Sequence, residues 1–334
     1  MSILVTGGAG YIGSHVVRLL QERSEQVVVV DNLLTGDRSR IGGAALVSLD
    51  LARPESAAPL AAAIREHGVT SVIHLAALKQ AGESVEQPVR YFRDNIGGVT
   101  TLLSAIEGTD VTRVVFSSSA AVYGNPSGAH VTEDAPTNPI NPYGQTKLAG
   151  EWLMAAAAAP LGIRTVSLRY FNVAGAGWPD LGDSFPLNLL TIAIDAISSG
   201  RRPKVFGTDF DTPDGTGVRD YVHVHDLASA HLAALDYLGK EDGAGTVFNV
   251  GTGSGASVLE VLNELSKASG IPIDPEHVAR REGDPAAVVA DVSRMSDELG
   301  WTASKDLPDM VASAWAAHEY RLARQRSAGT SDPA

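Results

Sequence analysis

Three side chains near the middle of the chain have the types and spacing of a proton-transfer site: Ser119, Tyr143 and Lys147. Tyr143 and Lys147 are four residues apart in a helical pattern, so both lie on one face and the ammonium can approach the phenol. A nearby cation lowers the pKa of tyrosine from about 10, because it favours the phenolate. Such a tyrosine is a general base near neutrality, and a serine hydroxyl can bind the substrate oxygen. The pair alone also fits a surface tyrosine beside a solvated lysine.

The segments around these residues predict how they are brought together. Ser119 follows an expected strand at 113–117, and Tyr143 lies near the start of an expected helix at 141–159. Further apolar strands are expected at 3–5, 26–30, 46–50, 71–75 and 164–169, and helices at 12–20, 55–67 and 88–107. Alternating strands and helices predict an α/β fold with a Rossmann-type, doubly wound parallel sheet, in which ligands bind at the carboxyl ends of the strands.

A glycine-rich turn after the first strand predicts a phosphate site. Gly7, Gly10 and Gly13 follow residues 3–5 and open the first helix. Glycine lets a pyrophosphate approach the backbone, and the helix N-terminus attracts the anion. Asp31 ends the second strand, at the offset where a carboxylate accepts hydrogen bonds from an adenosine ribose and repels a 2′-phosphate. The pattern favours NAD over NADP; the alternative is a tight turn with an unrelated aspartate.

The regular alternation of strands and helices ends after residue 172, which predicts two domains. Residues 1–172 form the expected NAD-binding domain, and 173–323 mainly a smaller lobe for a second substrate, with residues 247–250 returning to the main sheet. The polar segment 324–334 is expected to be a disordered tail.

Composition excludes several classes of function. The 334 residues include 26 basic and 39 acidic residues, for a net charge of −13, which disfavours binding to nucleic acid or anionic membranes. There is no cysteine, so disulfides and thiol nucleophiles are excluded. The sequence has no signal-type stretch or long apolar run, and we expect a cytoplasmic protein.

Longer motifs extend these patterns into a family resemblance. The segments are DNL at 31–33, ALKQAGES at 77–84, FSSSAAVYG at 116–124, NPYGQTK at 141–147, RYFNVAG at 169–175 and DGTGVRDY at 214–221. They resemble the extended short-chain dehydrogenase/reductase family, and within it the epimerases of UDP-hexoses. The resemblance runs from about residue 2 to residue 320, and DGTGVRDY is its most specific part.

The resemblance implies a mechanism and a set of site residues. Tyr143 would take the proton of the sugar 4-hydroxyl while hydride passes to tightly bound NAD, and the 4-keto sugar would turn before the hydride returns. Lys147 would lower the pKa of Tyr143 and hold the nicotinamide ribose, and Ser119 would bind the sugar oxygen. The implied cofactor-binding residues are Gly7, Gly10, Tyr11, Ile12, Gly13, Asp31, Asn32, Leu33, Leu34, Thr35, Gly36, Asp50, Leu51, Leu75, Ala76, Ala77, Leu78, Lys79, Asn95, Ser119, Tyr143, Lys147 and Phe171.

The implied substrate residues lie mostly in the second lobe. Besides Lys79, Ser119 and Tyr143 they are Asn172, Asn188, Leu189, Lys204, Val205, Phe206, Arg219, Arg281, Asp284 and Val288. In an acidic protein the two arginines are the expected partners of a UDP pyrophosphate, since a guanidinium binds phosphate oxygens in pairs. Val288 falls where relatives have a residue that lines the hexose pocket, and valine would leave room for an N-acetyl group.

Several alternatives stay open on the sequence. A nucleotide-sugar dehydratase would need an Asp-Glu pair where this chain has Ala120 and Ala121. A dehydrogenase that releases NADH and a non-catalytic NAD-binding regulator share the fold. His223 and His225 alternate along an expected strand, as metal ligands can, but we interpret them as structural and expect no metal. The resemblance also implies a homodimer packed through the helices at 88–107 and 141–159, and the segment between Asp31 and Asp50 is shorter than in many relatives.

Overall fold

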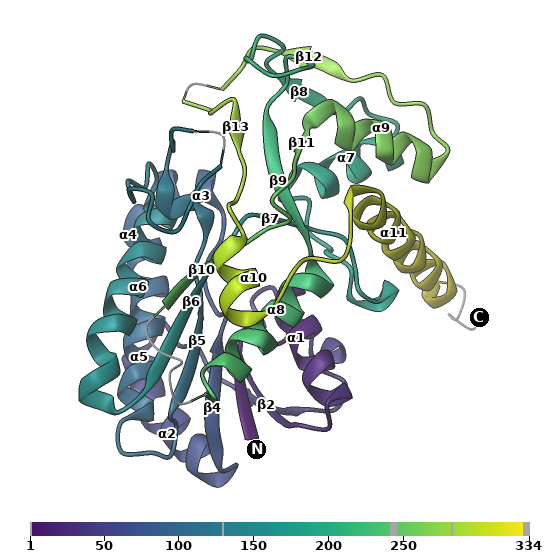
Figure 1. The fold of residues 1–334 in the computed structure, drawn as a ribbon. Helices are drawn as coiled ribbons and strands as arrows, with labels where there is room; N and C mark the ends of the chain where they lie inside the picture. The colour runs from purple at the N-terminus through teal and green to yellow at the C-terminus, as the bar shows by residue number, and fades with distance from the viewer. Residues whose placement is uncertain (1, 129, 241–245, 282, 330–334) are drawn as a thin grey trace. The chain divides into compact units, whose positions relative to one another are not determined.

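The computed structural model describes residues 2–128, 130–240, 246–281 and 283–329 (Figure 1). The chain forms two compact units. Unit 1 consists of Met1–Tyr170, Leu227–Val250 and Asp291–Thr302, and unit 2 of Phe171–Asp226, Gly251–Ala290 and Ala303–Ala334.

Unit 1 is built on a parallel sheet of seven strands in the order β10-β6-β5-β4-β1-β2-β3 (Figure 1). The strands are β1 (Ser2–Thr6), β2 (Gln26–Asp31), β3 (Ala45–Ser48), β4 (Val69–His74), β5 (Arg113–Ser117), β6 (Arg164–Tyr170) and β10 (Thr246–Val250). The strand order reverses between β1 and β4, which is the switch point where doubly wound sheets bind ligands. The predicted α/β fold is confirmed. β10 contains residues 247–250, the later segment that was predicted to join this sheet.

The helices of unit 1 are α1 (Tyr11–Glu22), α2 (Ala57–Glu66), α3 (Ala81–Glu86), α4 (Pro88–Tyr91), α5 (Gly97–Ile106), α6 (Pro142–Leu161), most of α8 (Val224–Tyr237), and α10 (Ser293–Leu299). Short 3-10 turns are η1 (Arg38–Ile41), η2 (Pro54–Ser56) and η4 (Ala120–Tyr123). One core joins the sheet to α2, α5 and α6 through buried side chains such as Leu4, Val72, Phe116, Leu102 and Met154. Parallel strands need this cover of apolar side chains, because a parallel sheet is normally buried on its faces.

The predicted helix at 88–107 is interrupted. Pro88 begins α4, and a single π-helical turn, η3 (Phe92–Ile96), separates α4 from α5. Turns of this kind occur mostly within α-helices and often at functional sites. The extra residue in the turn changes which side chains face inward, and Asn95 within η3 is buried.

Unit 2 is centred on β9 (Val218–His223), which pairs with β7 (Asn172–Ala174), β11 (Gly255–Ser257) and β13 (Ala287–Val288). A separate pair joins β8 (Lys204–Phe206) to β12 (Glu276–Val278). Its helices are α7 (Leu189–Ser198), α9 (Val258–Ser269) and α11 (Leu307–Gly329), with a 3-10 turn at η5 (Pro179–Leu181). A second apolar core, which includes Tyr221, Leu262 and Val311, lies among these elements.

The C-terminal segment differs from its prediction. Residues 324–329, expected to be disordered, continue α11 as far as Gly329, and the rest of the expected tail, 330–334, lies outside the described residues. Alanine, arginine and glutamine in this stretch have high helix propensity, so the helix extends beyond the last apolar contacts.

Candidate active site

The glycine turn after β1 has no space for side chains. Gly7 has φ +69°, and a Cβ there would lie 2.9 Å from the backbone nitrogen of Ala76. A Cβ on Gly13 would lie 2.1 Å from the Gly7 carbonyl oxygen, so α1 packs directly on the turn. Gly10 is the N-cap of α1 and cannot offer a side-chain oxygen to the first turn. The turn is therefore a backbone-lined cradle at a helix N-terminus, which suits a pyrophosphate.

Asp31 lies at the end of β2, next to this turn. Its buried carboxylate accepts hydrogen bonds from the backbone nitrogens of Ala9, at 3.0 Å, and Leu33, at 2.8 Å. Leu33 has φ +57°, a backbone conformation that is costly for a residue with a side chain and that often occurs at ligand sites. These two bonds fix the carboxylate, whose remaining lone pairs can accept from ribose hydroxyls. The residues present fit a dinucleotide.

The other predicted cofactor residues of unit 1 follow neighbouring strands of the sheet. Tyr11 and Ile12 begin α1 after β1; 32–36 follow Asp31 at the end of β2; Asp50 and Leu51 follow β3; and residues 75–79 follow β4. Asn95 lies in η3 and hydrogen-bonds to Leu78. The structure brings these residues to the carboxyl edge of one sheet. Phe171 belongs to unit 2.

The N-terminus of α6 positions the predicted base. Asn141 caps the helix by accepting a hydrogen bond from the Gly144 nitrogen at 2.9 Å, which places Tyr143 in the first turn. A Cβ on Gly144 would lie 2.5 Å from the Ala121 carbonyl oxygen, so the helix packs closely against the segment after Ser119. The Ser119 hydroxyl lies near the Tyr143 phenol as a result.

Lys147 lies one turn further along α6 and is buried. Its ammonium donates to the Ser117 carbonyl oxygen at 2.7 Å and lies 5.9 Å from the centre of the Tyr143 ring. Serine, tyrosine and lysine therefore come together, as the spacing predicts.

Burial acts in opposite directions on the two titratable groups of this cluster. It raises the pKa of Tyr143, and the nearby Ser119 hydroxyl lowers it in part. Burial lowers the pKa of Lys147 from 10.5 to about 8, against the attraction of Glu151, which raises it. Both shifts have the same cause, since an apolar environment disfavours the charged form of either group.

A buried ion pair beside Lys147 was missed by the sequence analysis. The Glu151 carboxylate accepts from Nε of Arg169 at 2.9 Å and from Nη2 at 2.6 Å, and it also accepts from the Ser118 hydroxyl. Arg169 further donates to the Tyr123 hydroxyl at 3.0 Å and the Glu133 carbonyl at 3.1 Å. The available signal was the spacing, because Glu151 is four residues after Lys147 and shares its helical face.

The two predicted UDP-binding arginines lie in unit 2. Arg219, on β9, donates through Nη2 to Asp284 at 2.6 Å and through Nη1 to the Val218 carbonyl at 2.7 Å. β13 pairs with β9 so that Val288 is opposite Arg219. Arg281 stacks its guanidinium 3.9 Å from the centre of the Phe206 ring. Ion pairing and stacking hold both side chains in place, as planar recognition of an anion requires.

The remaining predicted substrate residues of unit 2 have varied environments. Asn188 caps α7 and accepts from the Thr191 nitrogen at 3.0 Å, and Leu189 is the first residue of that helix. Asn172 is exposed and lies opposite Tyr221 in the pairing of β7 with β9. On β8, Lys204 is exposed and Val205 is fully buried.

The DGTGVRDY motif has a structural explanation that the sequence analysis did not reach. Buried Asp220 accepts from the backbone nitrogens of Thr252, at 2.8 Å, Gly253, at 3.0 Å, and Ala290, at 3.1 Å. Burial raises the pKa of this carboxyl, and the hydrogen bonds oppose the shift. Asp220 thus joins β9 to two loops of unit 2.

The two histidines lie in different elements, so the expected strand alternation is wrong. His223 ends β9, and His225 lies in α8, because the strand stops at His223 and the helix begins at Val224. His223 Nδ1 accepts from the backbone nitrogen of His225 at 3.0 Å, and Nε2 lies 3.1 Å from the Ser313 hydroxyl. These bonds support a structural interpretation. In the described part of the chain, no group of three or more His, Cys, Asp or Glu side chains is arranged to hold a metal ion.

Comparison with known proteins identifies relatives over nearly the full length. Residues 3–251 match the family described as NAD dependent epimerase/dehydratase. The UDP-glucose 4-epimerase of Streptococcus mutans is 45% identical over 95% of this chain and 97% of its own. The one from Azospirillum brasilense is 45% identical over 92% of this chain and 89% of its own.

Solved structures agree with this result. A UDP-glucose 4-epimerase from Stenotrophomonas maltophila, with bound NAD and formylated UDP-arabinopyranose, superposes with a TM-score of 0.91 at 41% identity, over 98% of this chain and 99% of that one. The UDP-Glc/GlcNAc 4-epimerase of Campylobacter jejuni gives a TM-score of 0.84 at 36% identity, over 96% and 99%. Within the described residues, no helix has both the length and the apolar character needed to cross a lipid bilayer.

Proposed function

Because the chain belongs to the NAD-dependent epimerase/dehydratase family, we propose that it is a UDP-glucose 4-epimerase, which interconverts UDP-galactose and UDP-glucose. The observation that carries the proposal is the buried cluster in unit 1, where the Ser119 hydroxyl lies near the Tyr143 phenol and Lys147 lies beside the tyrosine ring. Relatives of that name match almost the whole chain, and the Stenotrophomonas structure contains NAD and a UDP-sugar.

In this proposal each member of the cluster has one task. Tyr143 removes the proton of the sugar 4-hydroxyl and later returns it, and Ser119 holds the oxygen that loses and regains the proton. Lys147 supplies positive charge near the phenol and donates to ribose hydroxyls. The glycine turn and Asp31 would hold NAD, which would supply the acceptor and donor of the hydride at C4 of the sugar.

The residues of unit 2 suit the nucleotide part of the substrate. Arg219 and Arg281 are held by Asp284 and by the Phe206 ring, respectively, so their guanidinium planes are ordered before the ligand arrives. Preordered donors lose less conformational entropy on binding a pyrophosphate. A chain with 39 acidic residues needs such local positive charge to bind UDP.

The range of hexoses depends on the pocket lining, for which Val288 is our candidate. Valine is smaller than an aromatic side chain and leaves room for an N-acetyl group. The Campylobacter neighbour is named for both UDP-Glc and GlcNAc. We therefore propose UDP-N-acetylglucosamine as a second substrate, to be abandoned if the enzyme turns over only UDP-glucose and UDP-galactose.

The other reactions of the family fit this chain less well. Ala120 and Ala121 lie in η4, directly after Ser119, where a dehydratase would have an acid and a base. Alanine cannot transfer a proton, so elimination of water has no catalyst at these two positions. A dehydrogenase that releases NADH would need a continuous supply of NAD, which distinguishes it from the proposed reaction.

A homodimer follows from the same proposal. Large apolar side chains are exposed on α3, α4, η3 and α6: Val85 at 63%, Val89 at 80%, Phe92 at 41% and Trp152 at 65%. Exposed apolar side chains gathered on neighbouring helices usually mark an interaction surface, and a two-fold dimer covers one such surface with its own copy. The V89E/W152E double variant should then sediment as a monomer, whereas a wild-type monomer would contradict the proposal.

The deciding experiment uses UDP-galactose without added NAD. The purified protein is incubated with the sugar, UDP-glucose is followed by NMR, and free NADH is followed by its absorbance. Conversion without accumulation of NADH is the expected result for an epimerase with resident cofactor. No conversion, even with added NAD, would refute the proposal, and accumulation of NADH would support a dehydrogenase.

A further inference from the structure

The segment between β4 and α3 is held by side chains from the following helical region. This segment, residues 75–80, includes the predicted cofactor contacts at 75–79. Asn95 accepts from the backbone nitrogen of Leu78 at 2.8 Å and donates to its carbonyl at 3.1 Å. Two residues on, the backbone nitrogen of Gln80 donates to the Tyr91 hydroxyl at 3.0 Å. The segment is therefore fixed at two points, by the predicted cofactor residue Asn95 and by Tyr91, to which the proposed function assigns no role.

The Tyr91 hydroxyl is the less expected of the two anchors. The side chain is fully buried, and its hydroxyl donates to Glu83 Oε2 at 2.8 Å. A phenol has one proton, and an ionised carboxylate can only accept, so the Tyr91 hydroxyl donates its hydrogen bond to Glu83. A lone pair of the phenol oxygen is then available to accept from the Gln80 nitrogen. Burial raises the pKa of Tyr91, and Glu83 raises it further, so the hydroxyl stays protonated.

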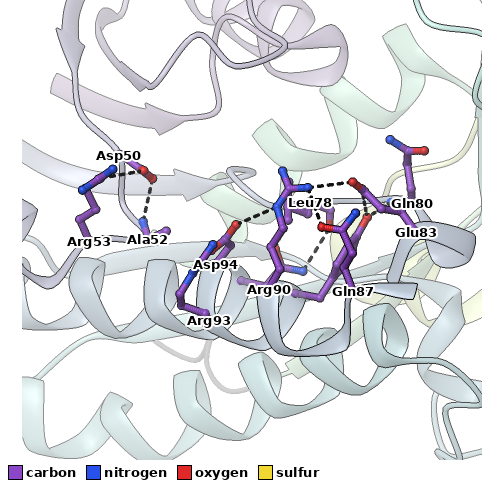
Figure 2. Close-up of polar contacts among 12 residues, drawn as sticks. Asp50, Ala52, Arg53, Leu78, Gln80, Glu83, Gln87, Arg90, Arg93 and Asp94 are labelled. Carbon is purple, nitrogen blue, oxygen red and sulfur yellow. Dashed lines mark hydrogen bonds and ion pairs between the residues drawn. The ribbon is translucent and has the colours of Figure 1, made fainter. Parts of the chain in front are cut away.

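Glu83 is itself fixed by charge. Arg90 Nη1 donates to Glu83 Oε1 at 2.9 Å and also contacts Gln87 Oε1 at 3.3 Å (Figure 2). Arg90 Nε lies 3.6 Å from Asp94, so the guanidinium is shared between two carboxylates. A continuous chain of polar contacts thus runs from Arg90 through Glu83 and Tyr91 to the backbone of Gln80.

We propose that Tyr91 and Glu83 are positioning residues for the cofactor, which set the conformation of residues 75–79 through the Gln80 backbone. The proposal rests on the proposed NAD-dependent function. Asn95 fixes the middle of the segment, and the Tyr91 hydroxyl fixes its end, so loss of either anchor lets the backbone depart from the form that binds dinucleotide. Neither Tyr91 nor Glu83 touches substrate in this scheme, and their effect is on the retention of NAD.

The expected magnitude follows from the single bond that is lost. Y91F keeps the buried ring and removes only the oxygen that accepts from Gln80 and donates to Glu83. One hydrogen bond within a preordered site corresponds to about a five- to tenfold change in a dissociation constant. E83L removes the acceptor that orients the hydroxyl and should have a similar effect, whereas E83Q keeps an acceptor oxygen and should restore most of the affinity.

The test measures NAD and sugar separately. The dissociation constant of NAD, and the kcat and KM for UDP-galactose at saturating NAD, are measured for Y91F, E83L, E83Q and the double variant Y91F/E83L. A matched control is Y237F, which removes a hydroxyl that donates to Glu298 at 3.2 Å at an exposed site. We expect five- to tenfold weaker NAD binding in Y91F and E83L, no further loss in the double variant, and wild-type behaviour of Y237F.

Two results would overturn the proposal: NAD affinity in Y91F within twofold of wild type, or losses that multiply in the double variant. A structural role alone would lower the melting temperature without changing NAD affinity at a temperature where the variants are folded. If the wild type binds NAD but does not convert UDP-galactose, the proposed function fails, while the NAD measurements still decide whether these residues position the segment.

Discussion

Removing the charge of Glu151 should destabilise unit 1 and weaken catalysis through one buried ion pair. E151Q leaves the Arg169 guanidinium, whose side chain is 7% exposed, without its carboxylate partner. Breaking a buried pair by neutralising one member costs about 3 to 5 kcal/mol in the free energy of unfolding. For a domain of this size each kcal/mol lowers the melting temperature by about 2 to 4 °C, so we expect a fall of about 10 °C.

The double variant E151L/R169L distinguishes the contribution of the ion pair to stability from that of the other hydrogen bonds around it. It removes both charges, but it deprives the Ser118 hydroxyl and the Glu133 carbonyl of their partners, at about 1 kcal/mol or more each. The double variant should therefore lose about as much stability as one single variant, far less than the sum of the two singles. D134N breaks an exposed pair with Arg294 and should cost less than about 1 kcal/mol.

Thermal unfolding of E151L, R169L, E151L/R169L, D134N and wild type decides the issue. Losses that add in E151L/R169L would mean that the two side chains do not interact energetically, and the reasoning would be refuted. A second readout is catalytic: because Glu151 raises the pKa of Lys147, E151Q should lower that pKa below about 8 and move the alkaline limb of the pH–rate profile to lower pH.

Three further predictions concern the cluster and the glycine turn. Y143F should lower kcat by about 10² to 10⁴ while NAD stays bound, and full activity would exclude the tyrosine as base. G13A should lose bound NAD, because its Cβ would lie 2.1 Å from the Gly7 carbonyl oxygen, whereas G82A, with nothing within 4 Å, should keep it. In cofactor-free protein the pKa of Lys147 is lowered from 10.5 to about 8. Between these two pH values Lys147 binds more protons in the unfolded chain than in the folded one, so its contribution makes the free energy of unfolding of the wild type rise with pH. K147M should lack this rise in thermal unfolding, and an identical pH dependence of the two proteins would contradict it.

Local sequence patterns were sufficient for the sheet of unit 1 and for the candidate base. Apolar runs bounded by turn residues predicted β1 to β6, since each strand is short and all but β3 are mostly buried. Ser119 and Tyr143 could be placed together because each lies next to an element that the sequence predicts. Ser119 comes directly after β5, and Tyr143 lies in the first turn of α6. The glycine turn was predictable for the same reason, as its constraint is local.

Features that depend on distant partners were not predictable. Glu151 shares a helical face with Lys147, yet its significance depends on Arg169, which comes from β6. Asp220 was seen only as part of a motif, because the nitrogens that it binds come from two later loops. The prediction that His223 and His225 share a strand was wrong because α8 begins directly after β9, and no proline or glycine marks that boundary.

The pKa shifts in the cluster decide which group titrates first in the protein alone. Burial raises the pKa of Tyr143 above 10 and lowers that of Lys147 to about 8, so the ammonium loses its proton before the phenol as pH rises. Once Lys147 is neutral, the nearby positive charge that would favour the phenolate is gone, and the phenol becomes a weaker acid still. The proposed base therefore depends on the lysine remaining charged, and Glu151 is the buried carboxylate that favours its charged form. The ion pair that stabilises unit 1 is in this way also part of the electrostatic environment of the candidate base.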